Sequence, residues 1–455
     1  MMHALQEALK FLLPYAAPLI YALVIVAVLP LVAGYVVLVE RKVMADMQAR
    51  LGPMRVGPHG LLQPIADAVK LLIKEDIIPE NADVWIFWLA PLVSVTAAML
   101  ALAPLAIGPA FQIARDINIG ILFVVGISAL GIFGIVLGGW ASNSHYSLMG
   151  ALRSAAQLVS YETAGGMALV SGLLLGGSLQ IRAIVEEQAR QGVWFVFLAP
   201  VAFFTYLVAS IAETNRAPFD LPEAESELVA GYMTEYSGFR WSLYFLAEYT
   251  NMIVVASVAT TLFLGGWMRP FSGVAWLGFL DYLPPLLALG VAGYCVYRAP
   301  RQPVAVQKLV MLAVAGLCVL VVVVLAAPLF VKPLLFLKPG IHGAFWFLTK
   351  VGAYIFVFMW LRFTLPRYRF DQLMRLGWYF LIPVSIVNVM GIAVALVLNW
   401  QFGVNRALAL TVTTGITLLI ALWLVAADRK REAQLLATGG AQGSEGAPAT
   451  DSYAG

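Results

Sequence analysis

The sequence predicts an all-α fold, a polytopic transmembrane protein whose helices cross a membrane about eleven times. Of its 455 residues, 61% are hydrophobic and 12% are charged, and the mean hydropathy is +0.87. A soluble domain has about 25% charged residues. Several uncharged stretches exceed the roughly 20 residues that a helix needs to cross a hydrocarbon core. They are residues 11–39, 84–114, 117–152, 191–212, 309–331, 376–405 and 407–427.

Further stretches complete the predicted set, and most of them carry a single charge inside. They are residues 153–177 with Glu162, 240–266 with Glu248, 342–361 with Lys350, and the short 282–297, which follows Asp281. The basic residues favour this set, because cytoplasmic loops collect Lys and Arg. One face then holds 19 of the 28 Lys and Arg, the other holds 8, and Lys350 lies within the membrane. The N-terminus is then outside and the C-terminus is cytoplasmic.

The first predicted cytoplasmic loop, residues 40–83, contains an amphipathic helix. Its polar face carries Asp67, Lys70 and Lys74. The apolar face repeats at helical spacing and consists of Leu61, Ile65, Ala68, Val69 and Leu72. Such a helix lies along the membrane surface or packs on neighbouring protein, and the sequence leaves both open. Residues 1–436 are predicted to form one membrane domain, followed by a disordered Gly/Ala/Ser-rich tail at 437–455.

Residues that hold redox groups are not evident. The two cysteines, Cys295 and Cys318, lie in apolar stretches without a CxxC pattern, which argues against an iron–sulfur or zinc-thiolate site. The four histidines are scattered along the chain. Glycine-rich nucleotide-binding strings are also missing from the sequence. If redox chemistry is involved, its electrons come from another polypeptide.

Charged residues inside the predicted spans are candidates for function, because each costs on the order of 2.5–3.5 kcal/mol to insert. Small residues surround Glu162 in "RSAAQLVSYETAGG", so we expect it to face the protein interior. Tyr244, Glu248 and Asn251 follow helical spacing and share one stripe. Lys350 is either a counter-charge to one of these carboxylates or a cation that extends to the membrane surface.

The segment "AETNRAPFDLPEAESELVAGYMTEYSG", residues 212–238, collects the scarce carboxylates. Six of the chain's 25 Asp and Glu fall between Glu213 and Glu235, with Arg216 as the only basic residue among them. Two carboxylates about 5 Å apart repel by roughly 3 kcal/mol at an effective dielectric constant near 20. Such a group must spread in water or titrate as a coupled set. A row from Glu213 through Glu162 and Glu248 would form a proton path into the membrane.

Several stretches together resemble the H subunit of NADH–quinone oxidoreductase, the respiratory complex I. They are "ERKVMADMQARLGPMRVGPHGLLQPIADAVKLLIKED", "GALRSAAQLVSYE", the acidic segment, "LAEYTNMI", "TTLFLGGW" and "TLPRYRFDQLMRLGW". Because they include long polar loops, the similarity goes beyond shared hydrophobicity. The family core would occupy about 11–267 and 340–427, with an inserted helix pair at about 270–335.

The resemblance implies a membrane subunit in a bacterial inner membrane. It would form part of a quinone-binding chamber and couple quinone reduction to proton translocation. The chamber would include Arg41, Gln48, Arg50, Arg216, Phe219, Asp220, Glu223 and Glu225. The proton path would include Glu213, Glu227, Glu235, Glu162 and Glu248. Quinone would be the substrate, while FMN and iron–sulfur clusters would belong to partner subunits of the hydrophilic arm. The resemblance assigns no catalytic residue, metal ligand or nucleic-acid partner to this chain.

Other interpretations give the acidic segment a different context. The equivalent membrane subunit of an energy-converting hydrogenase or of a ferredoxin- or F420-linked complex would use it with another electron source. A stand-alone ion antiporter is disfavoured by the missing internal repeats and by the large polar loops. An assembly scaffold would leave Glu162, Glu248 and the acidic segment without a role.

Overall fold

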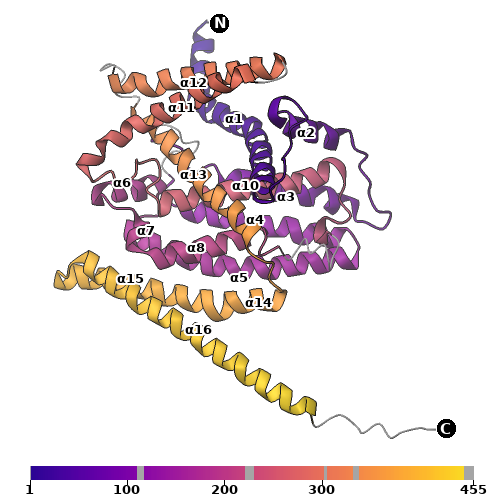
Figure 1. The fold of residues 1–455 in the computed structure, drawn as a ribbon, viewed down its shortest axis with the longest axis vertical. Helices are drawn as coiled ribbons and strands as arrows, with labels where there is room; N and C mark the ends of the chain where they lie inside the picture. The colour runs from indigo at the N-terminus through magenta and orange to yellow at the C-terminus, as the bar shows by residue number, and fades with distance from the viewer. Residues whose placement is uncertain (1, 110–116, 221–229, 302–304, 331–337, 445–455) are drawn as a thin grey trace.

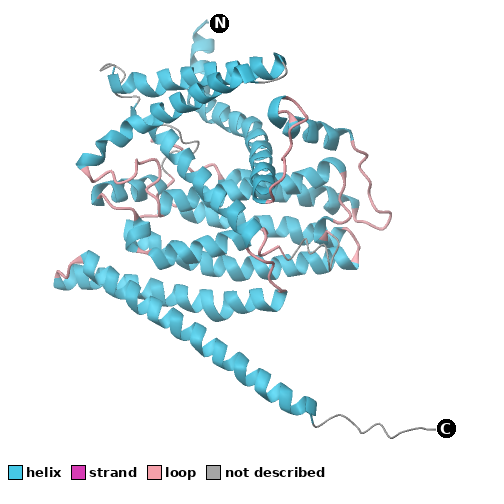
Figure 2. Ribbon diagram, in the orientation of Figure 1, coloured by secondary structure: helices cyan, strands magenta, loops and turns pink. Residues whose placement is uncertain are grey.

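The computed structural model describes residues 2–109, 117–220, 230–301, 305–330 and 338–444, with the backbone alone at 2–18, 21, 58, 275 and 431–444. Regular structure in these ranges is helical (Figures 1 and 2). Ten helices of the described chain are long and apolar enough to cross a membrane. The predicted polytopic helical fold is confirmed.

The centre of the molecule is a bundle of helices, most of which run side by side while α13 crosses them at an angle (Figure 1). They are α3 (Val84–Ala101), α4 (Gly120–Ala141), α5 (His145–Gly176), α8 (Pro200–Glu213), α10 (Gly238–Leu262) and α13 (Lys338–Thr364). Small residues allow the close approach. A Cβ atom on Gly139 of α4 would collide with that of Ala151 on α5, and one on Gly165 of α5 would lie 3.3 Å from that of Ala209 on α8.

The remaining helices surround this bundle. They are α1 (Met2–Met47), α2 (Gln63–Ile73), α6 (Ile181–Gln191), α7 (Phe195–Leu198), α11 (Leu283–Arg298), α12 (Ala305–Phe330), α14 (Phe370–Arg375), α15 (Ile382–Phe402) and α16 (Arg406–Ser444). A π-helical turn, Leu376–Leu381, joins α14 to α15. Figure 1 places the α11–α12 pair at one edge of the molecule and α15 and α16 at the opposite edge.

The predicted span at 191–212 is broken into α7 and α8. Pro200 begins α8, and Ala199 before it has φ −136° and ψ 61°, outside the helical region. Proline lacks a backbone N–H and disfavours helical geometry in the residue before it, so the two helices are separate. The resulting α8 has 14 residues and is shorter than the other spans.

The boundary between the third and fourth predicted spans lies earlier than expected. The sequence predicts a break at 152/153, but α4 ends at Ala141 and α5 begins at His145. Asn143 between them has φ +48°. Asparagine tolerates this left-handed conformation better than most residues, so a turn forms here within an apolar stretch.

The predicted amphipathic helix is present as α2, with Pro64 in its first turn. Its apolar side chains are not covered by the described part of this chain: Ile65 is 45% exposed and Leu72 is 62% exposed. Helix α2 is attached to α1 at its start, where a Cβ atom on Gly34 would lie 3.1 Å from that of Pro64. The exposed face is therefore available for lipid or for another protein of the same assembly.

The predicted disordered tail begins within a helix of the structure. Helix α16 continues through residues 437–444, where the sequence predicts a disordered tail, while 445–455 lie outside the described residues. Alanine and leucine in "AQLLAT" favour helix and extend it beyond the apolar stretch.

The pair α11–α12, predicted as an insertion, contacts the bundle through α13, where the imidazole Nε2 of His342 lies 2.8 Å from the carbonyl oxygen of Leu325.

Candidate functional site

The acidic segment begins with a turn that is held from two sides. The side-chain amide of Gln157 on α5 donates hydrogen bonds to the carbonyl oxygens of Ala212 and Phe219, both at 2.8 Å. The backbone N–H of Tyr368 donates to the carbonyl of Pro218 at 3.1 Å. The rings of Phe219 and Tyr368 stack with centroids 5.7 Å apart and planes 14° apart. The turn is thus fixed between α5 and the chain that follows α13.

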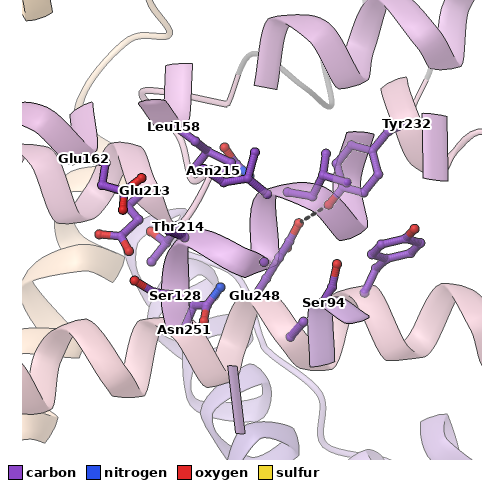
Figure 3. Close-up of a pocket in the computed structure, with 16 residues that line it drawn as sticks. Ser94, Ser128, Leu158, Glu162, Glu213, Thr214, Asn215, Tyr232, Glu248 and Asn251 are labelled. Atoms are coloured by element: carbon purple, nitrogen blue, oxygen red, sulfur yellow. Dashed lines mark hydrogen bonds between the residues drawn. The ribbon is translucent and has the colours of Figure 1, made fainter. Parts of the chain in front are cut away.

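A small cavity lies within the bundle, and carboxylates from three helices line it (Figure 3). They belong to Glu162 of α5, Glu213 at the end of α8, and Glu248 of α10. The cavity measures about 40 Å³, room for about three or four water molecules at about 10–15 Å³ each. The other polar residues around it are Ser94, Ser128, Thr214, Asn215, Tyr232, Tyr244 and Asn251. The structure therefore brings together the three carboxylates that the sequence predicted to form a row.

At one end of the cavity, Glu162 and Glu213 lie beside each other (Figure 3). They also line a second cavity of about 30 Å³, which continues past Ser128 towards Tyr206 and Val258. Within the described ranges, neither carboxylate has a Lys or Arg nitrogen within ion-pair distance. We call this pair of glutamates the cation-free end of the cavity.

At the other end, Glu248 is paired and buried. Its Oε2 atom lies 3.4 Å from Nη2 of Arg216, and its Oε1 atom accepts a hydrogen bond from the hydroxyl of Tyr232 at 3.2 Å. The guanidinium of Arg216 lies 4.2 Å from the ring centroid of Tyr249, a cation–π contact. Arg216 is 7% exposed and Glu248 is 8% exposed, so a buried ion pair fixes this end.

The contacts continue from Arg216 towards the end of α1. The hydroxyl of Tyr249 donates a hydrogen bond to Glu40 at 2.5 Å, and Glu40 forms an ion pair with Arg362 of α13. Glu40 is 5% exposed, although the sequence predicts that it begins the first cytoplasmic loop; in the structure α1 continues past it to Met47. Its position directly after the apolar stretch 11–39 was the signal that could have identified it. Tyr249 and Arg362 gave no comparable signal.

Residues predicted for the chamber from the first loop make local contacts. Arg41 forms an ion pair with Asp67 of α2 at 2.8 Å. The amide oxygen of Gln48 accepts a hydrogen bond from Nε of Arg50 at 2.7 Å, and this pair is exposed. Arg41 thereby ties α2 to α1, while Gln48 and Arg50 lie at the surface just beyond the end of α1.

The other predicted acidic residues divide into two groups. Glu223, Glu225 and Glu227 lie outside the described residues. Asp220 and Glu235 are half-buried, and neither lines the cavity. Next to Glu235, the ring of Tyr236 stacks on Phe87 at 4.0 Å, and burial raises the pKa of Tyr236 to about 12, so its hydroxyl stays neutral at physiological pH.

Lys350 is not a counter-charge to these carboxylates. Its ammonium group donates hydrogen bonds to the carbonyl oxygens of Leu264, Gly266 and Met268, at 2.6, 3.0 and 2.6 Å. It also lies 4.5 Å from the ring centroid of Trp194. All three donors of a lysine are thus used by the turn that follows α10, and the residue stabilises that turn.

Comparison with known proteins identifies the chain. The family model described as NADH dehydrogenase matches residues 19–296 and 305–393. An NADH-quinone oxidoreductase H subunit of Solibacter usitatus, the one numbered 2, is 54% identical over 383 residues, which cover 83% of this chain and 95% of that relative. The chain belongs to the family of NADH–quinone oxidoreductase H subunits. It is a multi-pass membrane component of that enzyme, and the other subunits of complex I are its partners.

Less similar relatives are H subunits as well. The H subunit numbered 1 of Koribacter versatilis is 48% identical over 393 residues, covering 82% of this chain and 90% of the relative. The H subunit of Rickettsia prowazekii is 40% identical over 385 residues, covering 84% and 95%. The family match includes most of the α11–α12 pair, and its proposed origin as an insertion stays a prediction. It ends before α16 begins.

Among the described residues, no three His, Cys, Asp or Glu side chains cluster closely enough to hold a metal ion. The polar groups of the cavity are carboxylates, hydroxyls and amides, which accept, donate and relay protons. What this arrangement can do chemically is hold a few waters and exchange protons among three glutamates.

Proposed function

We propose that this protein forms the membrane side of a quinone-binding chamber and that its glutamates carry protons from the chamber into the membrane. The single observation that supports this most is the cavity shared by Glu162, Glu213 and Glu248. Three carboxylates around a space large enough for a few waters form a hydrated path for protons. The second cavity extends this path beyond Glu162 and Glu213.

The paired end of the cavity supplies the link to quinone. Reduction of a quinone to a quinol consumes two electrons and two protons, so it changes both charge and proton demand nearby. Arg216 lies between Glu248 and Tyr249, and Tyr249 bonds to Glu40. A change in charge near this row alters the stability of the Glu248 carboxylate, and the cavity passes the effect to Glu213 and Glu162.

The chamber residues proposed from the family are Arg41, Gln48, Arg50, Arg216, Phe219, Asp220, Glu223 and Glu225, and partner subunits would complete the enclosure. The exposed apolar face of α2, beside α1, suits the entry of a quinone tail from the membrane. Electrons would arrive from FMN and iron–sulfur clusters on the partners. The proposed location is a bacterial inner membrane, with the N-terminus outside and the C-terminus in the cytoplasm.

The test compares Glu162→Gln with Glu186→Gln in the assembled enzyme in sealed vesicles. Glu186 lies on α6, is exposed, and pairs with Arg182, so it is a matched control outside the cavity. NADH oxidation and proton uptake into the vesicles are measured together. We expect Glu162→Gln to lose most proton uptake per NADH oxidised, while the control keeps it. Normal assembly with full proton uptake in Glu162→Gln would exclude a role for this glutamate.

A second experiment tests the partners. The chain, carrying an affinity tag, is isolated from gently solubilised native membranes. We expect proteins with flavin and iron–sulfur clusters to accompany it, together with NADH–quinone reductase activity that inhibitors of the quinone site abolish. Recovery of the chain with part of a hydrogenase, or alone, would contradict the proposal.

A further inference from the structure

A groove outside the acidic cavity lies between the chain that precedes α15 and the last helix, α16. Its volume is about 700 Å³. One wall comes from residues 368–380 and the other from residues 424–429.

Both walls change from polar to apolar in the same direction. On the first wall, Gln372 and Arg375 precede Leu376 and Phe380 along the chain. On α16 the order is reversed, with the apolar pair Leu424–Val425 before the charged pair Asp428–Arg429. Because α15 and α16 pack together and run in opposite directions, the two polar ends coincide. Figure 1 shows the start of α14 and the later part of α16 on the same side of the molecule.

The charges at the polar end favour an anion. Arg375 and Asp428 form an ion pair across the groove. Arg429 is exposed and adds a positive charge to the lining, and Lys430 follows it. Because Arg375 and Asp428 neutralise each other, Arg429 leaves this end of the groove with a net positive charge, while the other end is apolar. Tyrosine side chains such as Tyr379, which is 61% exposed, are typical of the level at which a membrane meets water.

The order of charged and apolar residues, and not the volume, selects the occupant. Arg375, Asp428 and Arg429 lie at one end of the groove, and Leu376, Phe380, Leu424 and Val425 follow towards the other. A phospholipid has the same order, with a charged headgroup at one end and apolar chains at the other.

Hydrogen bonds join the first wall of the groove to the part of α5 that precedes Glu162. The hydroxyl of Tyr161 donates to the carbonyl of Leu373 at 3.0 Å, and Nε1 of Trp378 donates to Oγ of Ser160 at 3.1 Å. Ser160 and Tyr161 directly precede Glu162 on α5. On the same wall, Tyr368 stacks on Phe219. An occupant of the groove therefore contacts a segment that braces both the cavity and the turn at Phe219.

We propose that this groove binds one phospholipid with an anionic headgroup, its phosphate at Arg375 and Arg429 and its acyl chains along Leu376, Phe380, Leu424 and Val425. One wall of the site lies on α16, which begins at Arg406, beyond the family match that ends at residue 393. The lipid closes the gap between α16 and the braced segment, and so supports the position of α5.

The test uses the assembled enzyme in phosphatidylcholine vesicles that contain a small share of photoactivatable phosphatidylglycerol, with the reactive group in an acyl chain. Labelled peptides are identified by mass spectrometry. We expect label on residues 372–380 and 424–429. Arg429→Gln should lower this label about fivefold, which corresponds to about 1 kcal/mol for one basic residue near anionic lipid. Leu424→Trp, which fills the groove, should remove it.

Matched controls separate the groove from the rest of the surface. Arg301→Gln removes another exposed arginine, and Leu422→Trp places the same ring on an exposed position of α16 outside the groove. Both should keep the label. Equal labelling by photoactivatable phosphatidylcholine would overturn the proposal, because the headgroup would not matter. So would displacement of the label by inorganic phosphate, or its absence from the wild-type groove together with a cross-link from this wall to a partner protein.

Discussion

The two ends of the acidic cavity differ in how their carboxylates are neutralised. Glu248 has an arginine at 3.4 Å and a tyrosine hydroxyl at 3.2 Å, and both partners are buried. Glu162 and Glu213 lie beside each other without a cation among the described residues (Figure 3). A carboxylate with a fixed cation keeps its charge, whereas two neighbouring carboxylates without one respond to each proton gained or lost. One cavity therefore combines a fixed end with an adjustable end.

Arg216→Met is expected to have the largest effect, because it removes the cation that distinguishes the Glu248 end of the cavity from the other. It leaves the Glu248 carboxylate buried without its cation, which costs about 3–5 kcal/mol in comparable buried pairs. We expect the amount of assembled enzyme in the membrane to fall sharply, as measured by native gel electrophoresis with an activity stain.

The double variant Arg216→Met with Glu248→Gln tests the reason for that loss. Removing both charges avoids an unpaired carboxylate, so assembly should recover most of the way to the wild-type amount. If the double variant assembles no better than Arg216→Met alone, then the packing of Arg216 on Tyr249, and not its charge, is what matters.

A smaller effect is expected from Tyr232→Phe, which removes the hydroxyl bonded to Glu248 and nothing else. A hydrogen bond to a charged group contributes about 1.5–3 kcal/mol. We expect normal assembly, with a lower temperature at which this chain dissociates from the purified complex. Tyr146→Phe removes an exposed tyrosine hydroxyl and should leave that temperature unchanged. A temperature that Tyr232→Phe leaves unchanged would mean that Arg216 alone holds Glu248.

The smallest effect on assembly is expected at the cation-free end. Glu213→Gln leaves no cation without a partner, so the stability of the complex should change by less than about 1 kcal/mol. Proton uptake per NADH oxidised should nevertheless fall, and this separation of assembly from proton uptake sharpens the comparison with Arg216→Met. A loss of assembly as large as that of Arg216→Met would show that the two ends do not differ in the way described.

The sequence predicted the spans because their apolar stretches are longer than a core helix needs, and it predicted the three cavity glutamates because buried carboxylates are rare. It did not predict where a helix is interrupted within an apolar stretch. Pro200 begins a new helix, but Pro91 lies inside α3, so proline alone does not mark the break, and Asn143 is a still weaker signal. The sequence also could not predict hydrogen bonds between residues that are far apart in the chain. Glu40 and Tyr249 are 209 residues apart, and Lys350 bonds to carbonyls 82 to 86 residues away. Backbone carbonyls exist at every residue, so no side-chain pattern marks those that a lysine will use.

The shortness of α8 has an electrical consequence. Its 14 residues measure about 21 Å, whereas a hydrocarbon core is about 30 Å thick. Helix α8 alone is therefore roughly 9 Å too short to cross such a core, so at least one of its ends lies within the core. The membrane potential falls across the low-dielectric layer, at about 2.3 kcal/mol per charge for each 100 mV. If that end is Glu213, a proton that it carries in the proposed path crosses only part of this potential, so the charge of this glutamate would depend on how strongly the membrane is energised.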